Sequence, residues 1–187
     1  TLALLSIWPN LPMGVLDGKS PRQAVADPQG QIRVQAIILQ MDLTEPVENP
    51  DYNKLRRSLG LPTLEAIDPT GVRVESLSPA RQTRLDTAKL TDEQLVAVYR
   101  RAVVTAAARL LRGISLEILS RPSLDTHKEL DKGEVYDILS RMALDAEEAL
   151  GYLVKAQELA KAKGRSPARY LMAELPYRLQ RGEEQES

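Results

Sequence analysis

The chain offers few side chains that could serve nucleophilic, redox or metal chemistry. It contains no cysteine and a single histidine, His127, in a polar stretch. The lack of cysteine excludes disulfides, thiolate zinc sites, iron–sulfur clusters and a cysteine nucleophile. A metal site at His127 would need ligands that the chain barely offers, so we expect this side chain at the surface. We therefore predict no metal site and no cofactor.

Carboxylates are the remaining candidates for catalysis, but their positions have a simpler explanation. Glu147 and Glu148, like Asp131 and Glu134, lie at expected helix starts, where negative charge complements the helix dipole. No phosphate-binding glycine loop, dinucleotide fingerprint, zincin motif or nucleophile elbow occurs. We therefore predict no catalytic residue. An enzyme subunit that uses carboxylates is the alternative, and it requires a deep pocket with converging acids.

Basic side chains could bind nucleic acid, yet the charges are balanced. The chain has 25 basic and 26 acidic residues, whereas non-specific nucleic-acid binding needs a strong positive field. A few well-placed arginines can still read DNA, and the short helices of 20–60 could form such a reader. That alternative requires one face that carries Arg22, Arg33, Lys54, Arg56 and Arg57. The basic group Lys161, Lys163, Arg165 and Arg169 surrounds an expected helix–helix turn. It could contact a phosphate or an acidic peptide, or it could form a solvated face.

Aromatic and arginine side chains are enriched at protein-binding hot spots. Trp8 is the only tryptophan, and it either anchors a binding surface or packs the N-terminal segment onto the core. The helices expected at 133–181 carry three tyrosines and an arginine that could line a groove for a peptide or a helix. The candidate partner-binding residues are therefore Trp8, Tyr136, Tyr152, Arg169 and Tyr170.

Short helices with tight turns are expected in residues 1–62. Three pairs, each an N-cap residue followed by proline at the first helical position, mark the starts: Ser20-Pro21, Asp27-Pro28 and Asn49-Pro50. The helix that follows the second pair is expected to reach about Leu43. Its predicted inward stripe consists of Ile32, Ala36, Leu39 and Leu43.

Residues 63–90 lack a sustained period and are predicted to connect two helical lobes. Val72 and Val74 alternate with charged residues, which permits a short strand or an extended segment, and Ser78-Pro79 indicates one more helical turn. From 91 to 187 the helical signal is strong. A capping box at Thr91–Gln94 begins a helix that we expect to reach about Arg112, with Gly113 either breaking it or lying within a continuation.

Three further helices are expected behind the polar loop at 122–132. The first runs from about Gly133 to Leu144, and the second runs from a cap at Asp145 to Lys163. The third begins after Ser166-Pro167 and reaches about Arg181. Pro176 removes one backbone hydrogen bond inside that last helix, so a kink or an early end is expected there.

The segment 145–159, DAEEALGYLVKAQEL, resembles the turn and second helix of a tetratricopeptide repeat. Ala149, Leu153 and Ala156 match the small, large, small spacing of that family. In the preceding helix, Asp137 and Ser140 depart from the pattern, since a small and an aromatic residue are expected there. The resemblance covers about residues 133–183 and implies an antiparallel helical stack that binds another protein.

A second resemblance concerns residues 9–25, PNLPMGVLDGKSPRQAV. A pattern in the toxin-binding domain of antitoxins of the Xre/MbcA/ParS type is similar to this segment at Pro9, Asn10, Gly18, Ser20, Pro21 and Ala24. This resemblance implies an antitoxin-like regulator as an alternative function. The same residues also suit a plain helix start, because most of them are turn and cap residues.

The predicted fold is all-α, with a short-helix N-terminal lobe (1–62), a connector (63–90) and an antiparallel helical domain (91–187) resembling tetratricopeptide repeats. The absence of phenylalanine and the many leucines and alanines favour packing of helix on helix. No apolar run approaches the roughly 20 residues that span a bilayer. The start, TLALLSIWPNLP, lacks the features of a signal peptide, and we expect a fragment of a larger cytoplasmic protein. The predicted function is a non-catalytic adaptor or scaffold that binds another protein or peptide.

Overall fold

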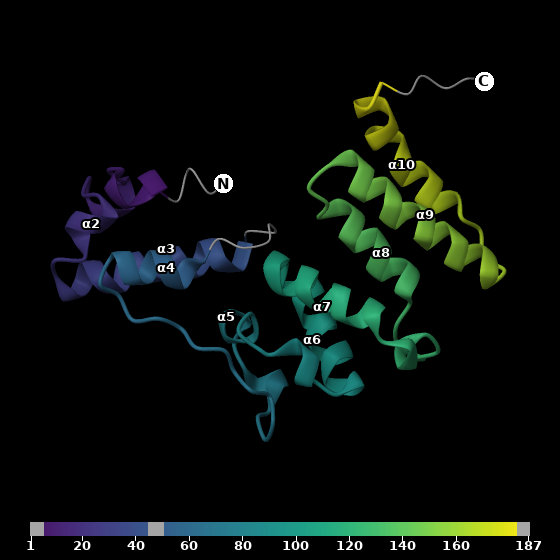
Figure 1. Ribbon diagram of the computed structural model, residues 1–187, viewed down its shortest axis with the longest axis horizontal. Helices are drawn as coiled ribbons and strands as arrows, with labels where there is room; N and C mark the ends of the chain where they lie inside the picture. The colour runs from purple at the N-terminus through teal and green to yellow at the C-terminus, as the bar shows by residue number, and fades with distance from the viewer. Residues whose placement is uncertain (1–5, 45–50, 183–187) are drawn as a thin grey trace. The chain divides into compact units, whose positions relative to one another are not determined.

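The computed structural model of the protein describes residues 6–44 and 51–182. Every regular element within those two ranges is helical, and the only pairing of strand type there is an isolated bridge between Ile67 and Leu85. The predicted all-α fold class is therefore confirmed (Figure 1). None of the described helices has the length and apolar character that a membrane span requires. The chain divides into two compact units, Thr1–Asp86 (unit 1) and Thr87–Ser187 (unit 2).

Unit 1 consists of short helices around one longer helix. Its elements are η1 (Trp8–Asn10), η2 (Gly14–Leu16), α2 (Pro21–Ala24), α3 (Pro28–Thr44), α4 (Tyr52–Ser58), η3 (Val74–Ser76) and α5 (Pro79–Gln82). Ser20 caps α2 through a capping box with Gln23, and Asp27 accepts the Gly30 N–H at the start of α3 (2.8 Å). The predicted start at Asn49-Pro50 lies outside the described residues, and Asp51 caps α4.

The buried face of α3 differs from the predicted stripe. Val34 and Ile38 are fully buried and Gly30 lies one turn earlier, whereas Ile32 is exposed. The prediction was wrong because the apolar run at 37–39 fits more than one helix face. Gly30 determines the face, since only a residue without a side chain fits so close to α2. The core of unit 1 comprises Trp8, Leu16, Ala24, Val34, Ile38, Tyr52, Leu55, Leu59 and Leu61.

The segment predicted as a connector, 63–90, lies mostly within unit 1. Val74 begins the 3₁₀ helix η3, so no regular strand forms there, although Arg73 before it has the extended backbone that was the alternative. Its side chain is fully buried, and its carbonyl accepts a hydrogen bond from Nε2 of the buried Gln82 (2.8 Å). The helical turn predicted at Ser78-Pro79 is present as α5. Local side-chain contacts therefore order this stretch without a regular sheet.

Unit 2 is a series of helices in which consecutive members pack on one another (Figure 1). The capping box of Thr91 and Gln94 begins α6, and Asp145 caps α9 by accepting the N–H of Glu148, both as predicted. The elements of unit 2 are η4 (Thr87–Lys89), α6 (Asp92–Thr105), α7 (Ala108–Ser120), η5 (Pro122–Leu124), α8 (Lys132–Arg141), α9 (Ala146–Ala162) and α10 (Ala168–Gln180).

The chain breaks between α6 and α7 at Ala106, and the single helix predicted to Arg112 is wrong. Ala106 adopts the left-handed conformation with φ of +49°. Gly113 does not break the helix and lies inside α7, which agrees with the continuation considered there. A left-handed alanine costs about 1–2 kcal/mol. The break lets Ala102 before it and Ala107 after it both become fully buried, which offsets that cost.

Two cations fix the end of α7. Arg121 donates to the Leu90 carbonyl (2.7 Å) and pairs with Asp92 (2.9 Å), so it ties the start of α6 to the end of α7. Lys132 donates to the carbonyl of Arg121 (2.7 Å) and pairs with Asp125 (2.6 Å). Positive charge is favourable at a helix C-terminus, where carbonyl groups lack partners. These contacts set the direction of the turn that leads into α8.

Replacing Gly30 with alanine is expected to destabilise unit 1, although alanine is the better helix former. A Cβ atom at this position would lie 1.9 Å from the carbonyl oxygen of Ala24, so the backbone must move. Overpacking costs about 1–3 kcal/mol, more than the ~1 kcal/mol that alanine gains in a helix. Urea denaturation measures the difference. Gly113→Ala is the control, because a Cβ there meets nothing within 4 Å, and a similar loss in both variants would contradict the close approach.

Ala106→Gly is expected to stabilise unit 2 by about 0.5–1 kcal/mol, because glycine adopts the left-handed conformation without strain. Thermal denaturation of the wild type and the variant measures the change. Ala36→Gly, at an exposed position inside α3 of unit 1, is the comparison and should lower stability. The same sign of effect in both variants would show that Ala106 is not strained.

Candidate docking surface on unit 2

The inner face of α10 packs against α8 and α9. Tyr170 is buried in a cluster with Leu153, Ala156 and Ala160 of α9, against which Tyr177 also packs. The small alanines allow the two helix axes to approach closely. The hydroxyl of Tyr177 donates to the carbonyl of Ser140 on α8 (3.1 Å). Helix α10 therefore contacts both members of the hairpin formed by α8 and α9.

Two buried carboxylates flank this inner face. Asp137 of α8 accepts hydrogen bonds from Arg141 (2.5 Å) and from Arg169 of α10 (2.7 Å). Glu174 of α10 accepts from Gln157 of α9 and pairs with Arg178 (2.8 Å). A buried carboxylate without partners would be strongly destabilising. The arginines are thus required for the helices to pack with these acids inside.

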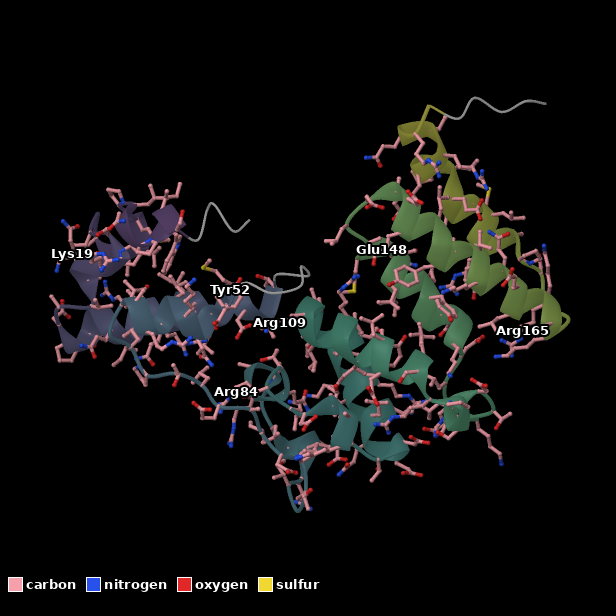
Figure 2. All side chains as sticks on the ribbon, in the orientation of Figure 1. Lys19, Tyr52, Arg84, Arg109, Glu148 and Arg165 are labelled. Atoms are coloured by element: carbon pink, nitrogen blue, oxygen red, sulfur yellow. The ribbon has the colours of Figure 1, made fainter. Side chains whose placement is uncertain are left out.

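Further ion pairs hold the turn between α9 and α10 against the start of α8. Asp131 pairs with Lys163 (3.1 Å) and with Arg165 (2.6 Å), which Figure 2 labels at this turn. Burial alone would raise the pKa of Asp131, but the Gly133 N–H and Lys163 outweigh it and lower the pKa below 3.8. A pocket of about 170 Å³ lies beside Asp131, Arg165 and Tyr170. Asp131 and Glu134, the two acids that line this pocket, are both paired with cations.

The outer face of α10 is also apolar. Leu171, Met172 and Leu179 are 48%, 67% and 74% exposed, and the partly buried Leu175 lies between them. Residues 171, 175 and 179 follow at intervals of four, so they share one face of the helix. We call these four residues the outer stripe. Helix α10 is therefore apolar on two opposite faces, whereas a helix at the edge of a fold usually has one apolar face.

Arginines border the outer stripe on both sides. Arg169 precedes Met172 by three residues, and Arg178 follows Leu175 by three, so each lies next to the stripe on the helix surface. Their side chains are 55% and 47% exposed, although each also neutralises a buried carboxylate. The surface of α10 thus combines exposed apolar side chains with half-exposed guanidinium groups.

Two of the predicted tyrosines lie together on α8 and α9. The ring centroids of Tyr136 and Tyr152 are 6.2 Å apart, and the Lys155 ammonium lies 5.8 Å from the Tyr136 ring. Both tyrosines are half-buried. The hydroxyl of Tyr152 donates to Glu148, four residues earlier in α9 (3.1 Å), and this hydrogen bond fixes the orientation of the Tyr152 ring. This pair forms a second, smaller patch of aromatic surface.

The other predicted residues have different surroundings. Arg169 stacks over Tyr170, with its Cζ 5.6 Å from the ring centroid, and Tyr170 itself is buried. Trp8 belongs to unit 1, where it is buried in the core. The sequence analysis missed the outer stripe and Arg178. The signal was present, since apolar residues at 170, 173 and 177 and at 171, 175 and 179 mark two faces of one helix.

Helix α10 continues through Pro176, so the early end considered there does not occur. Proline removes the hydrogen bond to the carbonyl of Met172. Both residues are exposed, so water can satisfy that carbonyl. The helix therefore keeps its full length, and Leu179 remains on the same face as Leu171.

An ion pair between a buried arginine and a half-buried glutamate connects α7 to α9. Arg112 of α7 is buried and pairs with Glu148 (2.8 Å), which Figure 2 labels at the start of α9. Glu148 also accepts the N–H of Leu144 (2.8 Å). Burial alone would raise the pKa of Glu148, but Arg112 and the Leu144 N–H outweigh it and lower the pKa below 4.5. The charged form of Glu148 is therefore the form that stabilises the folded chain.

The chain was compared with protein-family models, curated proteins and solved structures, and none of them matches it. Among the described residues, no group of three or more His, Asp or Glu side chains is placed to hold a metal ion.

Replacing Glu148 with glutamine is expected to destabilise unit 2 by about 1–3 kcal/mol at neutral pH, because Arg112 loses a charged hydrogen-bond partner. The folded-state pKa of Glu148 is lowered, so its contribution is present above the unfolded value near 4.5 and is lost as the pH falls below it. Thermal melts of the wild type and the variant should converge as the pH is lowered. The exposed neighbour Glu147, replaced with glutamine, is the control. A constant difference across this pH range would contradict the assignment.

Proposed function

We propose that the chain is a non-catalytic binding module, an adaptor or scaffold whose outer face of α10 receives a partner protein. The observation that carries this proposal is the double apolar character of α10. Its inner face packs against α8 and α9, whereas Leu171, Met172 and Leu179 on its outer face are exposed. Burial of apolar surface drives protein association, and an exposed apolar stripe bordered by polar groups is typical of an interaction site.

A stack resembling tetratricopeptide repeats supports this function. Ala149, Leu153 and Ala156, which carry the resemblance, are all fully buried. Helices α8, α9 and α10 pack in sequence order, as successive helices of such a stack would. Asp137 departs from the family pattern, and its two arginines compensate for it. In a stack of this kind, the outer face of the last helix is the face on which a further helix would pack.

The predicted contact residues take different roles in this proposal. Arg169 borders the outer stripe and is a contact residue. Tyr136 and Tyr152 are proposed to contact a partner that extends over α8 and α9. Tyr170 and Trp8 are buried, so we assign them to packing rather than to contact. A cytoplasmic location agrees with the lack of cysteine and stays a prediction.

The alternative of a nucleic-acid reader in unit 1 has less support. Of the five basic side chains it requires, Arg33 pairs with Asp17 (2.7 Å), Arg57 pairs with Asp51 (3.3 Å), and Arg56 is buried beside Asp42. Pairing with carboxylates lowers the positive potential that phosphate binding needs. We therefore rank a protein partner first. The antitoxin-like function rests on the resemblance of residues 9–25 alone.

Site-specific photo-crosslinking tests the proposed function. A benzophenone amino acid replaces Met172 or Leu179 in the full chain, and irradiation in lysate with and without nuclease is followed by mass spectrometry. Val104, which is 85% exposed on α6, is the matched control position. The expected result is a discrete protein adduct at 172 and 179 that survives nuclease treatment and is absent at 104.

A second variant checks that the adduct reports specific docking. Leu171→Gln, combined with the crosslinker at 179, is expected to reduce the yield of that adduct severalfold without changing the melting temperature by more than a few degrees. Equal adducts at 104, 172 and 179 would contradict a docking face. Adducts that disappear after nuclease treatment would favour the nucleic-acid alternative.

A further inference from the structure

The break between α6 and α7 lies in a stretch whose residues favour an uninterrupted helix. No glycine or proline stands between Asp92 and Arg112, and the break falls in a run of three alanines, Ala106–Ala108. Alanine is the best helix former, whereas a helix commonly ends at a glycine. Ala107 occupies the N-cap position of α7, and its side chain has no acceptor for the first N–H groups of that helix. The break is therefore imposed by packing rather than by the local sequence.

The apolar pattern also runs through the break without a change of phase. Residues that are buried in α6 and α7, together with Ala106, follow one another at intervals of three or four, the spacing of one helix face. These residues are Leu95, Tyr99, Ala102, Ala106, Leu110, Ile114 and Ile118. A single helix from Asp92 to Ser120 would therefore keep one apolar stripe along its whole length.

We propose that α6 and α7 can fuse into one helix, and that the fused form is a dimer in which two copies of the chain exchange α6 and the residues before it. In a single chain, straightening would pull α6 away from α7 and uncover the apolar faces of both helices. A second copy covers them again, because α6 of each chain then packs on α7 of the other. The partner is thus an identical chain, and this exchange is independent of the docking face on α10.

The fused form removes strain and adds hydrogen bonds at the hinge. Ala106, whose φ is +49°, would return to the right-handed helical region that suits a residue with a side chain. The first N–H groups of α7, from Ala108 to Leu110, have no acceptor within α7 and would gain carbonyls four residues earlier in the chain. These gains offset part of the entropy lost on association, so the protein concentration decides between monomer and dimer.

Two ion pairs join the two sides of the hinge. Arg121 at the end of α7 pairs with Asp92 at the start of α6, so the two helices run in opposite directions. Arg100 of α6 pairs with Glu129, which follows α7 (2.8 Å). Each pair joins a residue before Ala106 to a residue after it. In the exchanged dimer the same two pairs form between copies, so the exchange gives up neither of them.

Substitutions at residue 106 test the inference, because they shift the two forms in opposite directions. Glycine relieves the strain of the break and weakens a continuous helix, whereas valine rarely adopts a positive φ and is tolerated in a helix. The full chain of each variant is unfolded in urea, refolded at high protein concentration and analysed by sedimentation velocity. Relative to the wild type, we expect the dimer association constant to rise at least about tenfold in Ala106→Val and to fall by a similar factor in Ala106→Gly.

Matched controls and a second comparison keep this test decisive. Ala36→Val and Ala36→Gly, at an exposed position inside α3, should leave the association constant unchanged. Thermal melts show whether each variant folds. If Ala106→Val does not fold, the comparison of Ala106→Gly with the wild type still decides, because glycine is compatible with the break.

Crosslinking shows whether a dimer is an exchanged one. The chain has no cysteine, so Arg100→Cys in one sample and Glu129→Cys in another each introduce a unique thiol. The two variants are mixed, unfolded together, refolded and treated with a short bismaleimide. Because the two native side chains meet across the hinge, the exchanged dimer is expected to give a covalent heterodimer. Mixing without unfolding, and each variant refolded alone, should give only background.

Three outcomes would overturn the exchange. The first is a chain that stays monomeric at high concentration both as the wild type and as a folded Ala106→Val variant. The second is a dimer that substitutions at 106 leave unchanged and Met172→Gln/Leu179→Gln abolishes, since its contact would be the outer stripe of α10. The third is a dimer that gives no heterodimer crosslink between positions 100 and 129, since its chains would be closed. Photo-crosslinking at 172 and 179 judges the proposed function separately from all three.

Discussion

The pairing of two buried carboxylates determines how α10 lies on unit 2. Asp137 and Glu174 are removed from water, and each needs a cation within hydrogen-bonding distance. Arg141 and Arg178 meet that need from the same helix as each acid, whereas Arg169 reaches Asp137 and Gln157 reaches Glu174 from a neighbouring helix. These two contacts between helices fix the rotation of α10 about its own axis. Once the rotation is fixed, Tyr170 must point inward and the leucines at 171, 175 and 179 must point away from α8 and α9.

The ion pairs of Asp137 and Glu174 explain why the surface of α10 carries both apolar and positive groups. An interior of aliphatic residues alone would not require arginines at its edges. Because the acids are inside, their partners lie at the boundary between the core and the solvent, with half of each side chain exposed. A change in either arginine would therefore take a cation away from a buried carboxylate.

The sequence predicted the helix starts better than the helix faces and ends. Ser20, Thr91 and Asp145 cap helices as expected, because capping depends on residues only three positions apart. The face of α3 and the end of α6 depend on contacts between elements. Neither the closeness of Gly30 to Ala24 nor the left-handed Ala106 leaves a local signal.

The candidate site was predicted in part for the same reason. Tyrosine and arginine were selected by residue type, which located Arg169 and the pair Tyr136 and Tyr152. Residue type alone does not reveal exposure, so Trp8 and Tyr170 were selected although both are buried. Leu171 and Leu179 were overlooked because leucine in a helix usually faces the core. Only the packing of Tyr170 against α9, on the opposite face of α10, shows that these leucines do not face the core.

The Arg112–Glu148 pair gives unit 2 a property that a simple linear array of repeats lacks. In such an array each element touches only its immediate neighbours, so the ends can unravel step by step. Here α7 is bonded to α9 across α8, and α10 is bonded to α8 across α9. Detaching the terminal helix must therefore disturb contacts two helices away. Unit 2 should lose its protection against amide hydrogen exchange as one cooperative block rather than from the C-terminal end inward.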